Sequence, residues 1–129
     1  MRRFIALALL AGVAGCTRYT LDHHLNNAYR AYDEGNCEQV MLELSQAERK
    51  SRSRNYLQPE ISLLRGQCLE RQSLFVDAAQ TYQFIISRYP TSEYAYRARA
   101  RLETLDQLGQ AQPAAPAKPI PVPAAPPPR

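Results

Sequence analysis

The predicted fold of this chain rests on residues 66–90, which read 66-GQCLERQSLFVDAAQTYQFIISRYP-90. Two small residues, Gly66 and Ala78, are each followed three or four positions later by a larger one, Leu69 and Tyr82, and Pro90 ends the segment. Small residues let two helices approach closely, and the larger side chains fill the space beside those points. The stretch therefore predicts a helical hairpin, in which two antiparallel helices are joined by a short turn.

The same residues carry a resemblance to a repeat family. The order G-x2-Y, A-x3-F, P is typical of the tetratricopeptide repeat, and residues 66–90 resemble one such repeat. Ser62 and Arg65 stand where that pattern has a large aromatic residue and a leucine. The register places Ala28 of an earlier, weaker repeat at the position of Gly66. The resemblance implies that the repeats pack through Ala28, Gly66, Leu69, Ala78, Tyr82 and Pro90.

Three more helices are expected, two before this hairpin and one after it. Apolar residues recur every three or four positions before Gly35, after Asn36 and again after Pro90, which is the spacing of amphipathic helices. Asn36 is expected to cap one helix, Thr91 or Ser92 another, and Pro59 suits a first helical turn. We therefore expect an all-α domain over residues 21–108, a short solenoid of about five helices. The three stripes are Leu21, Leu25, Ala28 and Tyr32; Cys37, Val40, Leu44 and Ala47; and Ala95, Ala98, Leu102 and Leu105.

The N-terminal residues predict export and lipidation. Residues 1–15 have two arginines, an apolar run and a small pair before Cys16, which is typical of a secretory signal peptide. Val13-Ala14-Gly15-Cys16 resembles a bacterial lipobox, which implies cleavage before Cys16 and a lipid anchor on that cysteine. The alternative is a plain signal peptide with Cys16 near its cleavage site by chance. Residues 16–20 would form the tether. The resemblance implies the periplasmic face of the outer membrane, because Thr17 is not the aspartate that usually retains such lipoproteins in the inner membrane.

The C-terminal residues predict a tail without a core. Residues 109–129 are rich in proline and alanine, and eight of the last 17 residues are proline. Proline fixes the backbone near polyproline II, so we expect a disordered, semi-rigid spacer. The alternatives are a docking peptide for an aromatic groove and a strand that passes into the cell-wall layer.

The two remaining cysteines predict a disulfide. An exported protein meets an oxidising compartment. Cys37 would lie at the start of one helix and Cys68 near the end of the next, and these ends are neighbours when consecutive helices are antiparallel. We therefore expect a Cys37–Cys68 disulfide. The alternative is that both are buried thiols that pack as small hydrophobic residues.

Several function classes lack the residues that they need. The chain has no G-x-S-x-G, no H-E-x-x-H and no glycine-rich loop after a strand, so we expect no enzyme activity and no cofactor. Its only histidines, His23 and His24, are adjacent and would point about 100° apart on a helix, so we expect no metal site. The formal charge of +4, part of which belongs to the signal peptide, is too small to predict nucleic-acid binding.

Recognition of a protein partner remains as the expected function. Helical-repeat proteins bind extended peptides or helices mainly with the first helix of each hairpin. In this register the first helices contribute tyrosines and arginines, which are frequent interface anchors. The alternative is that these residues are ordinary solvated side chains. The candidate partner-binding residues are Tyr29, Arg30, Arg65, Tyr94, Arg97 and Arg101, with Asn27, Gln67 and Glu70 beside them.

The combined pattern resembles the tetratricopeptide-repeat lipoproteins of the Gram-negative outer membrane. The phrase YPTSEYA, residues 89–95, is similar to repeats in the lipoprotein of the barrel-assembly machine and in the Tol-Pal-associated coordinator. This resemblance implies a non-enzymatic, lipid-anchored adaptor that binds a partner in secretion, pilus, barrel-assembly or cell-wall machinery. Two alternatives stay open: a structural lipoprotein whose proline-rich tail reaches the peptidoglycan, and a pilotin-like chaperone.

Overall fold

The computed structural model describes residues 19–52 and 54–111, and this part of the chain is all-helical, as predicted. The first helix, called the N-terminal helix below, covers residues 19–33 of the described chain. It therefore includes residues 19 and 20, so the predicted tether of residues 16–20 extends two residues too far. The elements that follow are α2 (Cys37–Lys50), the 3-10 helix η1 (Asn55–Leu57), α3 (Gln58–Arg71), α4 (Phe75–Arg88) and α5 (Glu93–Gln107).

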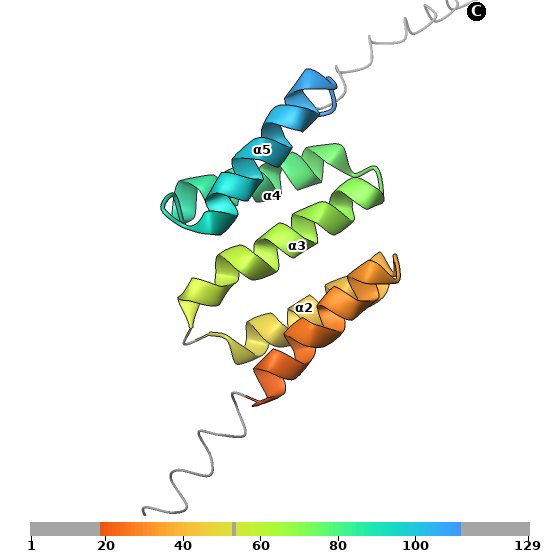
Figure 1. Cartoon of the computed structure of the whole chain (residues 1–129), viewed down its shortest axis with the longest axis vertical. Helices are drawn as coiled ribbons and strands as arrows, with labels where there is room; N and C mark the ends of the chain where they lie inside the picture. Colours follow the sequence, from red (N-terminus) through yellow and green to blue (C-terminus); the bar gives the residue numbers. More distant parts are fainter. Residues whose placement is uncertain (1–18, 53, 112–129) are drawn as a thin grey trace, which may run out of the picture.

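The five α-helices stack as consecutive antiparallel neighbours (Figure 1). The N-terminal helix and α2 form one hairpin, and α3 and α4 form the next. The last helix, α5, packs on both α4 and α3. In Figure 1 the N-terminal helix, α3 and α5 lie toward the viewer, whereas α2 and α4 lie behind. The first helices of the hairpins therefore share one side of the stack.

Local sequence signals account for the helix ends. The side chain of Asn36 accepts a hydrogen bond from the backbone N–H of Gln39, and that of Ser92 accepts one from Ala95, so both predicted caps are present. Pro59 lies in the first turn of α3, where its missing N–H is not needed. Gly35 has a φ of 76° in the turn before Asn36, a conformation that favours glycine.

The helix α3 contributes to two hydrophobic clusters. Ile61, Leu64 and Cys68 belong to the first cluster, which they form with the N-terminal helix and α2. Leu63 belongs to the second, with α4 and α5. Because α3 is buried on both sides, it joins the two halves of the stack.

Gly66 and Tyr82 form the tightest packing point between α3 and α4. Both residues are buried, and a Cβ atom added at Gly66 would lie 2.5 Å from Cε1 of Tyr82. Ala28 and Ala78 are fully buried as well, and Leu69 packs at the edge of the second cluster. Four of the six residues predicted to pack the repeats are therefore buried, and Leu69 is partly buried.

Pro90 does not share this role. It is exposed in the turn between α4 and α5, and α4 already ends at Arg88. A proline disfavours the helical conformation of the residue before it, so Pro90 stops the helix without filling the core.

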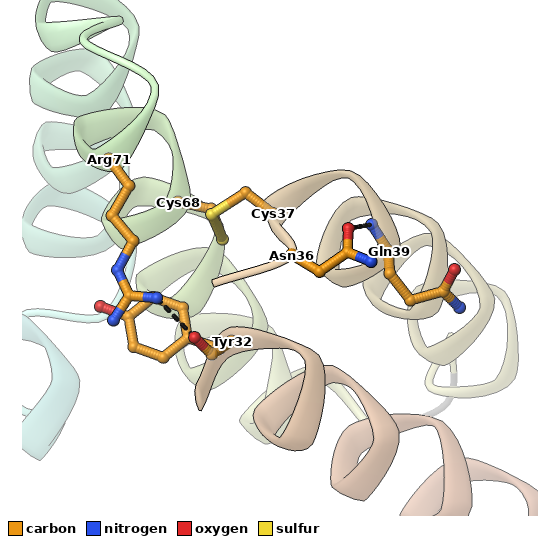
Figure 2. Close-up of a disulfide and its surroundings, with 6 residues drawn as sticks. All are labelled: Tyr32, Asn36, Cys37, Gln39, Cys68 and Arg71. Atoms are coloured by element: carbon orange, nitrogen blue, oxygen red, sulfur yellow. Dashed lines mark hydrogen bonds between the residues drawn. A yellow bond between two sulfur atoms is a disulfide. The ribbon is translucent and has the colours of Figure 1, made fainter. Parts of the chain in front are cut away.

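Cys37 and Cys68 lie at disulfide distance, as the sequence predicts. Their Cα atoms are 5.4 Å apart, and the pair joins the start of α2 to α3 (Figure 2). Both side chains are buried in the first cluster. Figure 2 also shows Arg71 lying over the ring of Tyr32 beside the disulfide. The link therefore connects the first hairpin to the second close to the turn at Asn36.

The predicted tail begins later than residue 109. The N–H of Gln110 donates to the carbonyl oxygen of Leu105, and Ala111 packs against the second cluster. The remaining residues of that tail, 112–129, lie outside the described residues. The same holds for the predicted signal peptide and for Cys16.

Replacing Gly66 by alanine should test the packing between α3 and α4. Alanine normally stabilises a helix interior relative to glycine by about 1 kcal/mol. Here the added methyl group collides with the buried ring of Tyr82, so we expect a net loss of about 1 to 2 kcal/mol in the free energy of unfolding. In a Tyr82→Leu background the same change should become neutral or stabilising. Urea denaturation of the four proteins measures both effects, and a stabilising Gly66→Ala in the original background would contradict this packing.

Removal of the disulfide should lower stability substantially. Cys37 and Cys68 are 31 residues apart in sequence, and closing a loop of this length is worth about 3 to 4 kcal/mol in the chain-entropy model. We expect Cys37→Ala/Cys68→Ala to lose about that much in urea denaturation. Alkylation of the denatured but unreduced protein should label neither cysteine. Labelling of both in protein made in an oxidising compartment would show that the thiols stay free.

Candidate functional site

Tyrosines and charged residues from three helices gather on the side of the stack formed by the N-terminal helix, α3 and α5. We call this surface the tyrosine–arginine face. Its residues fall into two adjoining groups, one centred on Glu60 and one centred on Glu70. They are Tyr29, Glu60, Tyr94 and Arg97, and Tyr32, Gln67, Glu70, Arg71 and Arg101.

The first group surrounds Glu60 at the start of α3. The hydroxyl of Tyr29 donates to Oε1 of Glu60 over 2.8 Å, which joins the N-terminal helix to α3. Burial and the nearby carboxylates of Glu60 and Glu93 raise the pKa of Tyr94, on α5, to about 12. Burial and Glu60 likewise raise the pKa of Tyr29, against the opposing effect of Arg97. Both tyrosines are therefore neutral near pH 7.

The second group surrounds Glu70 near the end of α3. The carboxylate of Glu70 accepts hydrogen bonds from the hydroxyl of Tyr82 and from two nitrogens of Arg101, with Nε of Arg101 at 3.0 Å from Oε1. It thereby links three consecutive helices, α3, α4 and α5. Burial and Glu70 together raise the pKa of Tyr82, and the hydrogen bonds to Glu70 raise that of Arg101. Arg101 is thus held by Glu70 while its side chain stays half-exposed.

A hollow of about 310 Å³ lies beside this second group. It is lined by Tyr32, Gln67, Glu70, Arg71 and Arg101. The guanidinium of Arg71 lies 3.5 Å from the centroid of the Tyr32 ring and donates to the Tyr32 carbonyl oxygen. This hollow presents the guanidinium of Arg71 and the edge of the Tyr32 ring beside the ion pair of Glu70 and Arg101.

Four of the six predicted partner-binding residues lie on the tyrosine–arginine face, and two do not. Tyr29, Tyr94, Arg97 and Arg101 are on it. Arg30 instead lines a hollow of about 250 Å³ between the N-terminal helix and α2, together with Asn27.

Arg65 lies on the opposite side of α3. Its two terminal nitrogens donate to the carboxylate of Glu48 on α2 over 3.0 and 2.9 Å. It lines a hollow with α4 residues, among them the half-exposed Phe84. Arg65 therefore does not share a face with Tyr29, because α3 turns its side chain toward the second helices of the hairpins.

Three residues of the face were missed as partner-binding candidates: Tyr32, Glu60 and Arg71. Tyr32 was assigned to a buried stripe, although it is only partly buried and supports Arg71. Glu60, Gln67 and Arg71 recur at seven and four positions along α3, which places them on one side of a helix. Applied in both directions from Gln67, that spacing would have identified Glu60 and Arg71 from the sequence.

Two negative findings apply to the described residues alone. Residues 19–52 and 54–111 hold no group of three or more His, Cys, Asp or Glu side chains that could bind a metal ion. Within the same ranges no helix has both the length and the apolar character needed to cross a membrane.

Comparison of the chain with protein-family models, with curated proteins and with solved structures gave no significant match.

Hydrogen-bonded carboxylates outside the tyrosine–arginine face make stability depend on pH. His24 Nδ1 lies 2.7 Å from Glu43 Oε2, and hydrogen bonds from His24 and from Arg65 lower the pKa values of Glu43 and Glu48, respectively, below 4.5. A carboxylate whose pKa is lowered by folding stabilises the fold above its unfolded pKa, and this contribution is lost as pH falls through its folded pKa. Stability should therefore decline below about pH 4.5.

The variant Glu43→Gln/Glu48→Gln should be less stable than the unchanged protein at neutral pH and lose less stability on acidification. Urea midpoints measured between pH 7 and about pH 3 test this. The matched control Glu34→Gln/Glu103→Gln removes the same charge from exposed positions and should keep the original pH dependence. Equal slopes for the two double variants would exclude Glu43 and Glu48 as the source of the acid sensitivity.

Proposed function

We propose that this protein is a non-enzymatic adaptor, anchored by lipid at Cys16 to the periplasmic face of the outer membrane. Its tyrosine–arginine face would bind a protein partner in secretion, pilus, barrel-assembly or cell-wall machinery. The lipobox-like sequence before Cys16 supports the anchor. The surface of the helical stack supports the binding role.

The observation that carries this proposal is the convergence of Tyr29, Glu60, Tyr94 and Arg97 from three helices. They come from positions far apart in sequence, yet Tyr29 hydrogen-bonds Glu60. Tyr94 and Arg97 are close enough to Tyr29 to affect the pKa of its hydroxyl. Tyrosine gives a large contact area at a low entropic cost, and arginine gives directional hydrogen bonds. A surface with these properties suits a protein partner better than a small molecule, which normally needs an enclosed pocket.

The arrangement also favours an elongated partner segment. The face runs across the N-terminal helix, α3 and α5, so a peptide or helix laid across the stack would contact all three. This is how tetratricopeptide-like stacks present a binding surface, and the close approach of α3 and α4 at Gly66 supports that interpretation. Both signs of charge are present, from Glu60 to Arg97, so the partner segment should carry polar groups of both kinds.

A matched pair of variants on α5 tests the binding face. Tyr94 and Arg97 lie on the face, whereas Tyr96 and Arg99, two residues further along, point away from it and are exposed. A photo-crosslinking amino acid at position 94 should capture a specific envelope protein in living cells, and one at position 96 should not. Tyr94→Ala/Arg97→Ala should weaken binding of the captured partner at least about tenfold, and Tyr96→Ala/Arg99→Ala should not.

Two further arms separate the alternatives. Deletion of residues 112–129 should leave crosslinking at position 94 intact. Loss of crosslinking in the deleted protein would favour the tail as the functional element. After a high-salt wash, which removes proteins bound by charge alone, fractionation of a Cys16→Ser variant exported by an ordinary signal peptide should find the protein released from membranes. Retention on the membrane would contradict the lipid anchor and would not count against the proposed binding face.

A further inference from the structure

Four basic residues lie together where α2 ends. Arg49, Lys50, Arg52 and Arg54 fall within six positions, and no acidic residue occurs from position 49 to 59. The first three are exposed and the fourth is partly exposed. Among the described residues none of the four forms an ion pair, and the neighbouring carboxylate of Glu48 is already paired with α3. The group therefore carries an unneutralised positive charge.

This basic group lies at the same end of the first hairpin as the start of the N-terminal helix. His24 pairs with Glu43, and Glu34 lines a hollow with Gln39, so the two helices run antiparallel. Tyr19 therefore lies near the last turn of α2, and Figure 1 shows both helix ends at one end of the hairpin.

The distance to the proposed anchor is short. Tyr19 is three residues after Cys16, and three extended residues span at most about 11 Å. An anchor at Cys16 would therefore keep the basic group close to the membrane surface. A tether this short lets the basic side chains approach anionic head groups to within the Debye length, about 8 Å under physiological conditions, where salt screens their attraction least.

Two exposed tyrosines lie at the same end. The side chains of Tyr19 and Tyr56 are 75% and 68% exposed. Tyrosine combines an apolar ring with a polar hydroxyl and is enriched at the level of lipid head groups. Tyr19, Arg49, Lys50, Arg52, Arg54 and Tyr56 together are called the anchor-end patch.

We infer that the anchor-end patch binds anionic phospholipid head groups of the leaflet that holds the anchor. This inference extends the proposed lipid anchoring at Cys16. Each basic residue near an anionic surface strengthens binding by about fivefold, so the patch adds to the hold of the lipid. Contact at the patch would also fix the orientation of the helical stack, since a lipid tether alone leaves the domain free to rotate.

The experiment uses the chain from residue 16 onward with Cys16→Ser, which keeps every described helix and lacks the lipid. The chain has no tryptophan, so Tyr56→Trp and Tyr96→Trp give single fluorescent reporters at two exposed positions. Vesicles of phosphatidylcholine alone are compared with vesicles that also contain phosphatidylglycerol. We expect a blue shift of the tryptophan at position 56 on the anionic vesicles, and no shift at position 96.

Charge variants locate the contact. Arg49→Gln/Arg52→Gln should weaken binding to anionic vesicles at least about tenfold. The matched control Arg30→Gln/Arg99→Gln has the same net charge as Arg49→Gln/Arg52→Gln, but both of its changes lie outside the patch. It should weaken binding less than about threefold. Circular dichroism checks that both variants remain helical.

Three results would overturn the inference: no preference for anionic vesicles, equal losses in the two charge variants, or equal shifts at positions 56 and 96. Because the Cys16→Ser chain used in this experiment carries no lipid, its vesicle binding does not depend on lipidation. The fractionation experiment can therefore contradict the lipid anchor, and the vesicle experiment can contradict the anchor-end patch, independently of each other.

Discussion

The structure depends on the double burial of α3. One side of this helix packs with the first hairpin, through Ile61 and Leu64, and another side packs with α4 and α5, through Leu63. A short helical stack has little core, and neither half can bury its apolar residues without a neighbour. Because α3 provides that neighbour to both halves, its rotation and its distance from α4 decide the geometry of the whole domain. Gly66 sets that distance by leaving room for the ring of Tyr82.

The candidate binding surface is a product of the same packing. Glu70 extends from α3 to Tyr82 on α4 and to Arg101 on α5, so the helices that bury the core also position the exposed side chains. Glu60 does the same toward the N-terminal helix through Tyr29. Charged side chains that are held by hydrogen bonds lose less conformational entropy when a partner binds. A rigid face of this kind favours recognition of one partner segment over adaptation to many.

Local signals in the sequence were sufficient for the helices and for the Cys37–Cys68 pair, whereas the polar contacts between the hairpins were not predictable. Asn36 could be identified because a cap acts within its own turn, and Cys37 and Cys68 could be paired because antiparallel helices bring their ends together. Arg65 could not be placed, because α3 has apolar residues on most of its circumference and their periodicity does not define an outward side. The contact from Tyr29 to Glu60 spans 31 residues and depends on the tilt between two hairpins, which no local pattern encodes.

The disulfide has a mechanical consequence for a protein held at one end. Tension between the N-terminal side of Cys37 and the C-terminal side of Cys68 would pass through the sulfur atoms and bypass residues 38–67. Most of α2 and α3 would carry no load, although a fully stretched segment of that length would add about 100 Å to the chain. Unfolding under force would then be confined to the N-terminal helix and to α4 and α5. In the proposed anchored protein, the link would limit extension between the membrane and the proposed partner.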